Sequence, residues 1–211
     1  LNGYLAAYVG YPAIIVTLAT WYVWRSVALV VNDTKPISAE LPGGIDGLVG
    51  TVAGLRLHIL VVFVPVVVVI WVLLNRTTFG RRIYGVGTNE IAAHFAGLQV
   101  ARTRFHAFAI SGLLAGIAAI TVTAYYHSAR PDAGDPMILR AITVAVLGGV
   151  AISGGAGKVS GVVLATLLVA FLNGGLTLLE VGARYQLAAL GALLLGSALL
   201  NVWSQRRFRV Q

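Results

Sequence analysis

Long apolar runs separated by short polar segments are the feature that most constrains what this chain can fold into. A helix rises about 1.5 Å per residue, so about 20 apolar residues cross the roughly 30 Å hydrocarbon core of a bilayer. The runs that fit this length, fully or nearly, cover residues 12–31, 57–74, 105–125, 137–152, 159–179 and 185–203. The sequence therefore predicts an all-α, polytopic integral membrane protein, a single domain over residues 1–211 with about six transmembrane helices.

The composition indicates a bilayer rather than water as the solvent. Only 10% of the 211 residues are charged and 58% are hydrophobic, whereas ordinary soluble domains carry about 25% charged residues. Such a chain cannot cover its surface with polar groups, and its hydrophobicity excludes an intrinsically disordered protein. The sequence contains no cysteine, which excludes disulfide scaffolds, thiolate metal sites and cysteine nucleophiles.

The net charge of +8 is explained by membrane orientation rather than by nucleic-acid binding, because the basic residues lie between apolar runs. If residues 75–104 are cytoplasmic, the alternation of the spans places nine Lys and Arg residues inside and five outside. Six of the seven acids then lie at the outer side, and the C-terminus is cytoplasmic.

No catalytic or metal-binding motif emerges from the sequence. The glycine-rich stretch 148–158 ends in Gly-Lys but lacks the first glycine of a Walker A loop, because Ile152 occupies that position, and Val159 replaces its Ser or Thr. We predict instead a turn between two closely packed helices. The four histidines share no i,i+4 spacing, and there is no G-x-S-x-G sequence, so neither a metal site nor a cofactor is expected.

Polar residues inside the predicted spans are candidates for a solute pathway. Arg25 is the strongest, because a charge within a span normally faces protein or a water path. It could equally extend its guanidinium to the outer interface, since a polar turn follows about seven residues later. Asn173 either bonds across helices or lines a cavity. The remaining candidates are Thr17, Thr20, Ser111 and Thr143.

Residues 75–104 form the longest polar stretch and hold five arginines but one acid, Glu90. Within this predicted loop, residues 89–97 are expected to form a short amphipathic helix, because Ile91, Phe95 and Leu98 recur at helical spacing. Long ordered loops are usually functional. The residues alone leave two interpretations open: docking of a cytoplasmic partner, or anchoring at the membrane surface.

Residues 78–98, TFGRRIYGVGTNEIAAHFAGL, resemble the cytoplasmic loop of bacterial ABC importer permeases of the ribose, xylose, galactose and autoinducer-2 type. That loop follows the pattern T-x-x-G-R-x-I-Y-A-x-G-x-N-x-x-A-A-x-x-S-G-I. Ala96 stands here in place of its usual Ser and Leu98 in place of its usual Ile. The positions that match its second half are Asn89, Ala92, Ala93 and Gly97.

Two further stretches carry the same resemblance. Residues 141–149, AITVAVLGG, with the glycines that follow, are similar to the family's A-I-A-A-V-V-L-G-G…G-G-x-G stretch, and residues 1–18 are similar to its L-N-G…I-V-T-L stretch. The order and spacing of the motifs extend the resemblance over essentially the whole chain. It corresponds to the C-terminal two-thirds of such a permease, without the N-terminal third.

The resemblance implies an inner-membrane permease subunit of a binding-protein-dependent ABC importer for a monosaccharide or similar neutral solute. Its implied partners are a second permease subunit, a cytoplasmic ATP-binding subunit that hydrolyses the ATP, and a periplasmic solute-binding protein. The helix at 88–97 would be the coupling helix. The residues expected to dock on the ATPase are Thr88, Asn89, Glu90, Ala92, Ala93 and Gly97.

Three alternatives stay open at this point. The chain could be a branched-chain amino acid or nucleoside permease of the same superfamily. It could be a nonfunctional truncated permease. It could also be an intramembrane structural or assembly protein.

Overall fold

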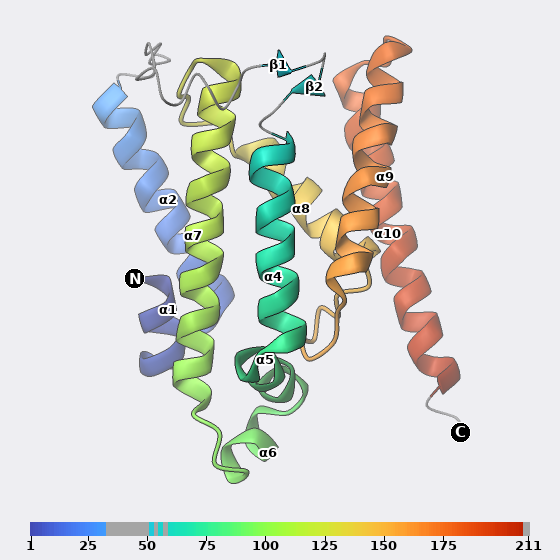
Figure 1. The fold of residues 1–211 in the computed structure, drawn as a ribbon. Coiled ribbons are helices and arrows are strands. Elements are labelled where there is room, and N and C mark those ends of the chain that lie inside the picture. The colour runs from blue at the N-terminus through green and yellow to red at the C-terminus, as the bar shows by residue number, and fades with distance from the viewer. Residues whose placement is uncertain (33–50, 53–54, 57–58, 209–211) are drawn as a thin grey trace. The chain divides into compact units, whose positions relative to one another are not determined.

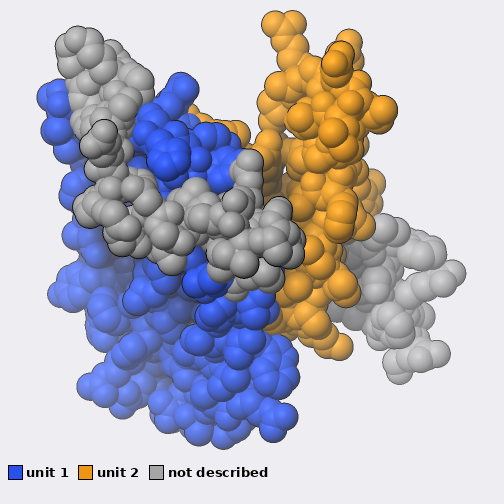
Figure 2. All heavy atoms as spheres, turned by 45° about the horizontal axis from the view of Figure 1, so that its top comes forward, with its two compact units in different colours: residues 1–133 blue, residues 134–211 orange. Residues whose placement is uncertain are grey.

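The computed structural model describes residues 1–32, 51–52, 55–56 and 59–208. The described chain divides into two compact units, residues 1–133 and 134–211, which Figure 2 distinguishes by colour. The predicted outer loop at 32–56 and the start of the predicted span at 57–74 lie almost wholly outside the described residues, as do the last three residues of the predicted basic tail.

The all-α polytopic class is confirmed. Within the described residues, three helices are long and apolar enough to cross a membrane: α2 (Ala13–Asn32), α7 (Val100–Tyr126) and α9 (Val159–Leu178). A fourth span results if the bent pair at 61–88 is counted as one. The larger number of six spans therefore stays a prediction. The described strands, β1 (Thr51–Val52) and β2 (Leu55–Arg56), form one short antiparallel hairpin.

Unit 1 is arranged around α7 (Figure 1). The N-terminal helices pack against it, and so do the two helices that precede it in the chain. Further elements of this unit are α1 (Asn2–Tyr4), η1 (Leu5–Val9), η2 (Ile59–Phe63), α4 (Val64–Arg76), α5 (Thr78–Thr88) and α6 (Glu90–Phe95). Pro65 lies in the first turn of α4, directly after the π-helical turn η2.

Unit 2 consists of α8 (Asp135–Leu147), α9 and α10 (Ala183–Phe208), and α8 packs against both of the others. The glycine-rich turn after α8 is confirmed as a site of close helix packing. A Cβ atom at Gly148 would lie 2.6 Å from the Cα of Val162, and one at Gly161 would overlap the carbonyl oxygen of Gly148. Only glycine allows the two helices to approach this closely.

Large apolar side chains cover the outside of the spanning helices. Ile14 on α2 is 73% exposed and Phe171 on α9 is 79% exposed. Between 6% and 11% of the residues in the three spanning segments are buried. Such a surface would aggregate in water, so lipid or other apolar helices must cover it.

Candidate functional site

A polar arm formed by α5 and α6 connects α4 to α7. The sequence predicted a loop with one short helix here, but α5 is helical throughout and α7 already begins at Val100. The difference has a physical reason: the glycines of α5 lower its intrinsic helix propensity, whereas packing against α4 and α7 stabilises it. Figure 1 shows the arm at one end of α4 and α7.

The bend between α4 and α5 depends on Thr77 and Gly80. The helices meet at 72°. The hydroxyl of Thr77 donates to the carbonyl of Leu73 at 2.6 Å and accepts from the N–H of Gly80 at 3.3 Å, so it ends one helix and caps the next. Gly80 is buried against the last turn of α4. Gly80 matches the glycine of the family pattern, but the sequence did not indicate that it sets the bend.

Two capping residues define the short helix α6. The side-chain oxygen of Asn89 accepts from the N–H of Ala92 at 2.9 Å. Gly97 adopts φ +78°, and the N–H groups of Gly97 and Leu98 bond to the carbonyls of His94 and Ala93, each at 3.0 Å. This is a Schellman motif with glycine in the left-handed position. The motif residues Asn89 and Gly97 thus shape the helix from within.

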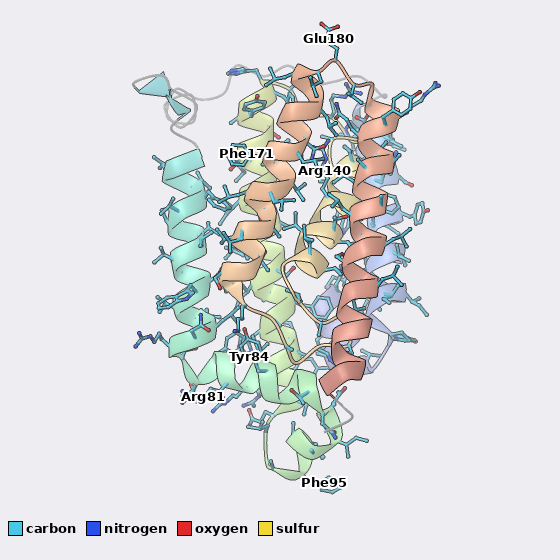
Figure 3. The ribbon with its side chains drawn as sticks, turned by 90° about the vertical axis from the view of Figure 1, so that its right-hand side faces the viewer. Arg81, Tyr84, Phe95, Arg140, Phe171 and Glu180 are labelled. Atoms are coloured by element: carbon cyan, nitrogen blue, oxygen red, sulfur yellow. The ribbon has the colours of Figure 1, made fainter. Side chains whose placement is uncertain are left out.

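An apolar pair projects from the outer side of α6. Ile91 is 71% exposed and Phe95, one turn later, is 85% exposed. Figure 3 shows Phe95 on the tip of the arm, pointing away from the body of the unit. On the opposite side of the helix, Ala93 is only 6% exposed. A helix that exposes two large apolar side chains outside the spanning segments is suited to insertion into a protein cleft or a membrane surface.

The predicted docking residues divide into different roles. Ala93 is only 6% exposed and lies on the side of α6 that faces its own unit. The hydroxyl of Thr88 donates to the carbonyl of Tyr84 at 2.8 Å. Glu90 pairs with Arg104 at 2.6 Å. Ala92 is exposed beside the apolar pair and is the predicted residue best placed to touch a partner.

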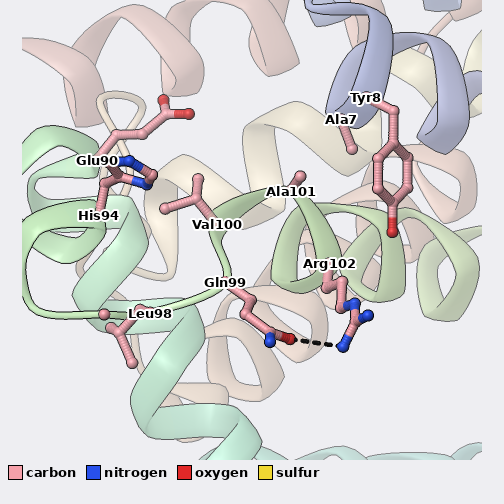
Figure 4. Close-up of a pocket in the computed structure, with 10 residues that line it drawn as sticks. Ala7, Tyr8, Glu90, His94, Leu98, Gln99, Val100, Ala101 and Arg102 are labelled. Atoms are coloured by element: carbon pink, nitrogen blue, oxygen red, sulfur yellow. Dashed lines mark hydrogen bonds between the residues drawn. The ribbon is translucent and has the colours of Figure 1, made fainter.

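An open hollow of about 610 Å³ lies between α6, the start of α7 and η1. Figure 4 shows the side chains that line it, with Gln99 accepting a hydrogen bond from Arg102 at 2.9 Å. Tyr8 borders it from η1, and Glu90 and His94 border it from α6. Among the described residues, no three His, Asp or Glu side chains are grouped so that they could hold a metal ion.

The candidate pathway residues bond mainly to their own helices. The hydroxyl of Thr20 donates to the carbonyl of Val16, and that of Thr143, fully buried, donates to the carbonyl of Leu139. Thr17 likewise donates to the carbonyls one turn earlier. Such bonds satisfy the hydroxyl proton and leave only acceptor capacity for a solute. Ser111 lines a smaller hollow of about 240 Å³ formed by α4, α5 and α7.

Asn173 differs from the threonines. Its amide nitrogen donates to the carbonyl of Val169 at 2.9 Å, but its side-chain oxygen is buried and has no hydrogen-bond partner within the described structure. A buried acceptor of this kind is costly unless another group reaches it. The asparagine is therefore suited to accept a hydrogen bond from a neighbouring helix or a solute.

Arg25 lies in the second half of α2, which ends at Asn32, with its guanidinium 5.4 Å from the ring centre of Trp21. Beyond α7, Arg130 and Asp132 form a 2.8 Å ion pair. The hydrogen bond from Arg130 is the largest cause that holds the pKa of Asp132 below its ordinary value, and the positive charge of Arg25 adds a smaller contribution. Arg25 lies beside the Trp21 ring, and its charge acts on Asp132, which lies outside the spans. Both observations favour the interpretation that Arg25 extends its guanidinium to the membrane interface.

These features define a polytopic membrane protein that presents a short, doubly capped helix on a polar arm. The family model described as "Branched-chain amino acid transport system / permease component" matches residues 1–198. The chain belongs to this permease family, which confirms the resemblance seen in the sequence.

The similar curated proteins are sugar or signal import permeases. The ribose import permease protein RbsC of Bacillus subtilis (strain 168) is 37% identical, over 95% of this chain and 62% of its own length. The autoinducer 2 import system permease protein LsrD of Photorhabdus temperata is 32% identical, over 98% of this chain and 67% of its own. The D-allose transport system permease protein AlsC of Escherichia coli (strain K12) is 31% identical, over 95% and 61%.

The chain thus spans about three-fifths to two-thirds of the length of the relatives it matches. No solved structure matches it significantly.

Proposed function

We propose that this chain is a membrane-spanning subunit of a binding-protein-dependent ABC importer that carries a monosaccharide or similar small neutral solute. Similarity to permeases for ribose, autoinducer 2 and D-allose over more than nine-tenths of the chain carries the proposal. The subunit performs no bond chemistry itself, because a partner ATPase supplies the energy. In this proposal the subunit is embedded in the bacterial inner membrane, with its C-terminus in the cytoplasm.

The helix α6 is the coupling helix in this proposal. Its exposed Ile91 and Phe95 insert into a cleft of the cytoplasmic ATP-binding subunit, and the caps at Asn89 and Gly97 keep it rigid. Closure of the ATPase dimer then moves α6 as a body, and the arm transmits that movement to α4 and α7, which α5 contacts.

Two further partners belong to the proposed assembly. A second permease subunit covers part of the apolar surface of the spanning helices, and lipid covers the rest. A periplasmic solute-binding protein delivers the solute to the outer side. Nothing in the proposed mechanism uses nucleic acid.

The proposed solute is neutral and rich in hydroxyl groups. The uncharged polar groups within the spans include Thr hydroxyls with free acceptor capacity and the amide oxygen of Asn173. These groups accept hydrogen bonds from hydroxyls and supply no charge pair for a zwitterion. The family description supports a second candidate, a branched-chain amino acid permease. Stimulation of the ATPase by a sugar-loaded, rather than a leucine-loaded, binding protein would decide between them.

A co-purification experiment tests the docking assignment. The chain is expressed with its ATP-binding subunit in variants Ile91→Glu and Phe95→Glu, with Leu179→Glu as the matched control. Leu179 is 76% exposed and precedes the turn predicted to be outside, so the control adds the same charge away from the ATPase. We expect at least a tenfold loss of bound ATPase in the two α6 variants and no loss in the control.

Other outcomes separate the alternatives. If ATPase association is unchanged while the arm of the α6 variants becomes more accessible to protease in membranes, the arm is a surface anchor. If the unaltered chain binds no ATP-binding subunit, the chain is a structural protein or a nonfunctional permease.

The orientation has its own test, since the chain has no cysteine. In Thr88→Cys and Asp132→Cys variants, a membrane-impermeant maleimide should label position 88 only from the cytoplasm and position 132 only from outside. The reverse pattern would overturn the orientation of the whole subunit.

A further inference from the structure

One ion pair ties the short helix α6 to the long helix α7. Arg104 donates from Nη2 to Oε2 of Glu90 at 2.6 Å. Within the described part of the chain, this is the only side-chain hydrogen bond or ion pair between the two helices. Glu90 is also the sole acid between residues 75 and 104. Side-chain bonding between α6 and α7 therefore rests on this one pair.

The same arginine reaches a third element. Its Nη1 lies 3.5 Å from the carbonyl oxygen of Ala6, which is 1% exposed within η1. A guanidinium offers five N–H donors in a planar fork, so one side chain can bond a carboxylate along one edge and a carbonyl beside it. η1 is a π-helix, a geometry that is frequent at functional sites in proteins.

The N-terminal helices and α7 pack tightly around this point. A Cβ atom at Gly3 would lie only 2.8 Å from Cβ of Phe108, and the rings of Tyr8 and Phe105 are 5.9 Å apart. These close contacts make α1, η1 and α7 one packed body. The hollow of Figure 4 separates part of α6 from this body, and α6 otherwise packs against α5 and α7.

We propose that Arg104 is a positioning residue that fixes the orientation of α6 and carries its movement to α7 and to the N-terminal helices. This inference rests on the proposed function of α6 as the coupling helix. The side chains of Arg104 and Glu90 are 38% and 50% exposed, so their ion pair contributes little to folding stability. Its loss therefore affects the coupling of the two helices more than the fold.

The first arm of the experiment measures position without any partner. Spin labels are placed at Ala92→Cys on α6 and Leu113→Cys on α7, both exposed positions in a chain without other cysteines. We expect a narrow distance distribution in the parent, a broadened one in Arg104→Ala and Glu90→Ala, and a narrow one again in the charge-reversed double variant E90R/R104E. An unchanged distribution in both single variants would overturn the positioning role.

The second arm measures coupling in the importer assembled with its ATP-binding subunit and loaded binding protein. Arg104→Ala and Glu90→Ala should each lower stimulated ATPase activity at least fivefold while the subunits still co-purify, and E90R/R104E should recover half or more. Arg102→Ala is the matched control, because Arg102 lies on the same helix and its side chain bonds only that of Gln99 among the described residues. It should stay within twofold of the parent.

The two arms test position and coupling independently. Broadened distances with unchanged stimulation would overturn the coupling role. Loss of co-purification in Glu90→Ala alone, without rescue by charge reversal, would show that Glu90 contacts the ATPase directly and would overturn the proposal. If the parent chain binds no ATPase, the proposed function fails, but the distance measurement still decides the role of Arg104.

Discussion

Gly80 at the start of α5 lies against the backbone of Leu74 in the last turn of α4, so that a Cβ atom at position 80 would come within 2.6 Å of the Leu74 carbonyl carbon. The contact is between two backbones, and no side chain can rotate to relieve it. The bend that carries the polar arm therefore depends on the absence of one side chain.

The variant Gly80→Ala should lower the stability of unit 1 by about 1–3 kcal/mol, because overpacking forces the backbones apart. Thermal unfolding in detergent, followed by the fluorescence of the four tryptophans, measures the change. Gly85→Ala on the same helix is the control, since its Cβ would meet only Leu98 Cδ1 at 3.7 Å. That variant should be neutral or stabilising by up to about 1 kcal/mol. Equal destabilisation by both would contradict the close contact.

Gly97→Ala should weaken the end of α6, because an L-residue in the left-handed conformation costs about 1–2 kcal/mol. Gly97→Asn should destabilise the end of α6 less than Gly97→Ala does, since asparagine tolerates this conformation. Hydrogen exchange of the Gly97 and Leu98 amides, which close the helix, reports the effect directly. If the alanine and asparagine variants speed up this exchange equally, the left-handed φ of residue 97 is not the cause of the destabilisation.

Glu180→Gly should raise stability by about 1 kcal/mol. Glu180 adopts φ +55° at the end of α9, where its N–H bonds to the carbonyl of Thr177 at 3.1 Å, a position that glycine prefers. Figure 3 shows Glu180 at the tip of the turn between α9 and α10. Glu180→Ala is the control, because it removes the charge but keeps the unfavourable φ. A gain in melting temperature with alanine equal to that with glycine would assign the effect to charge.

Asp132→Asn should reveal that Asp132 contributes to the free energy of unfolding, and that this contribution changes with pH only in the acid range. The hydrogen bond from Arg130 lowers the pKa of Asp132 in the folded protein, so the carboxylate favours folding above its unfolded pKa. That contribution is lost as pH falls through the folded pKa. The stability difference between parent and variant should be constant above about pH 5 and shrink below about pH 4. It should be small and decrease with salt, because the pair is exposed.

The sequence predicted the membrane class and the approximate ends of most helices, because a bilayer demands long apolar segments whatever surrounds them. It also predicted a short helix at 89–97 and close helix packing at the glycine-rich turn 148–158, since both depend on short-range patterns. It missed α5, because a segment rich in glycine and arginine is typical of a loop. Packing against α4 and α7, which the sequence does not show, stabilises it as a helix.

The roles of individual residues within the arm could not be predicted from their positions in the sequence. Asn89, Ala93 and Gly97 matched a family motif and are predicted to dock on the ATPase. The structure adds that Asn89 and Gly97 cap α6 and that Ala93 faces inward, which the motif did not indicate. Whether a small residue touches a partner or its own protein depends on which face of the helix is covered, and that is a tertiary property.

The sequence by itself determined that this chain is an all-α membrane protein of the permease family with a basic arm, because hydrophobic length and motif order are local properties. Only the tertiary structure decided that Gly80 sets the bend of the arm and that Arg104 joins Glu90 to the N-terminal helices. Those relationships link residues 6, 90 and 104, and the folded packing of α7 alone brings them within hydrogen-bonding distance.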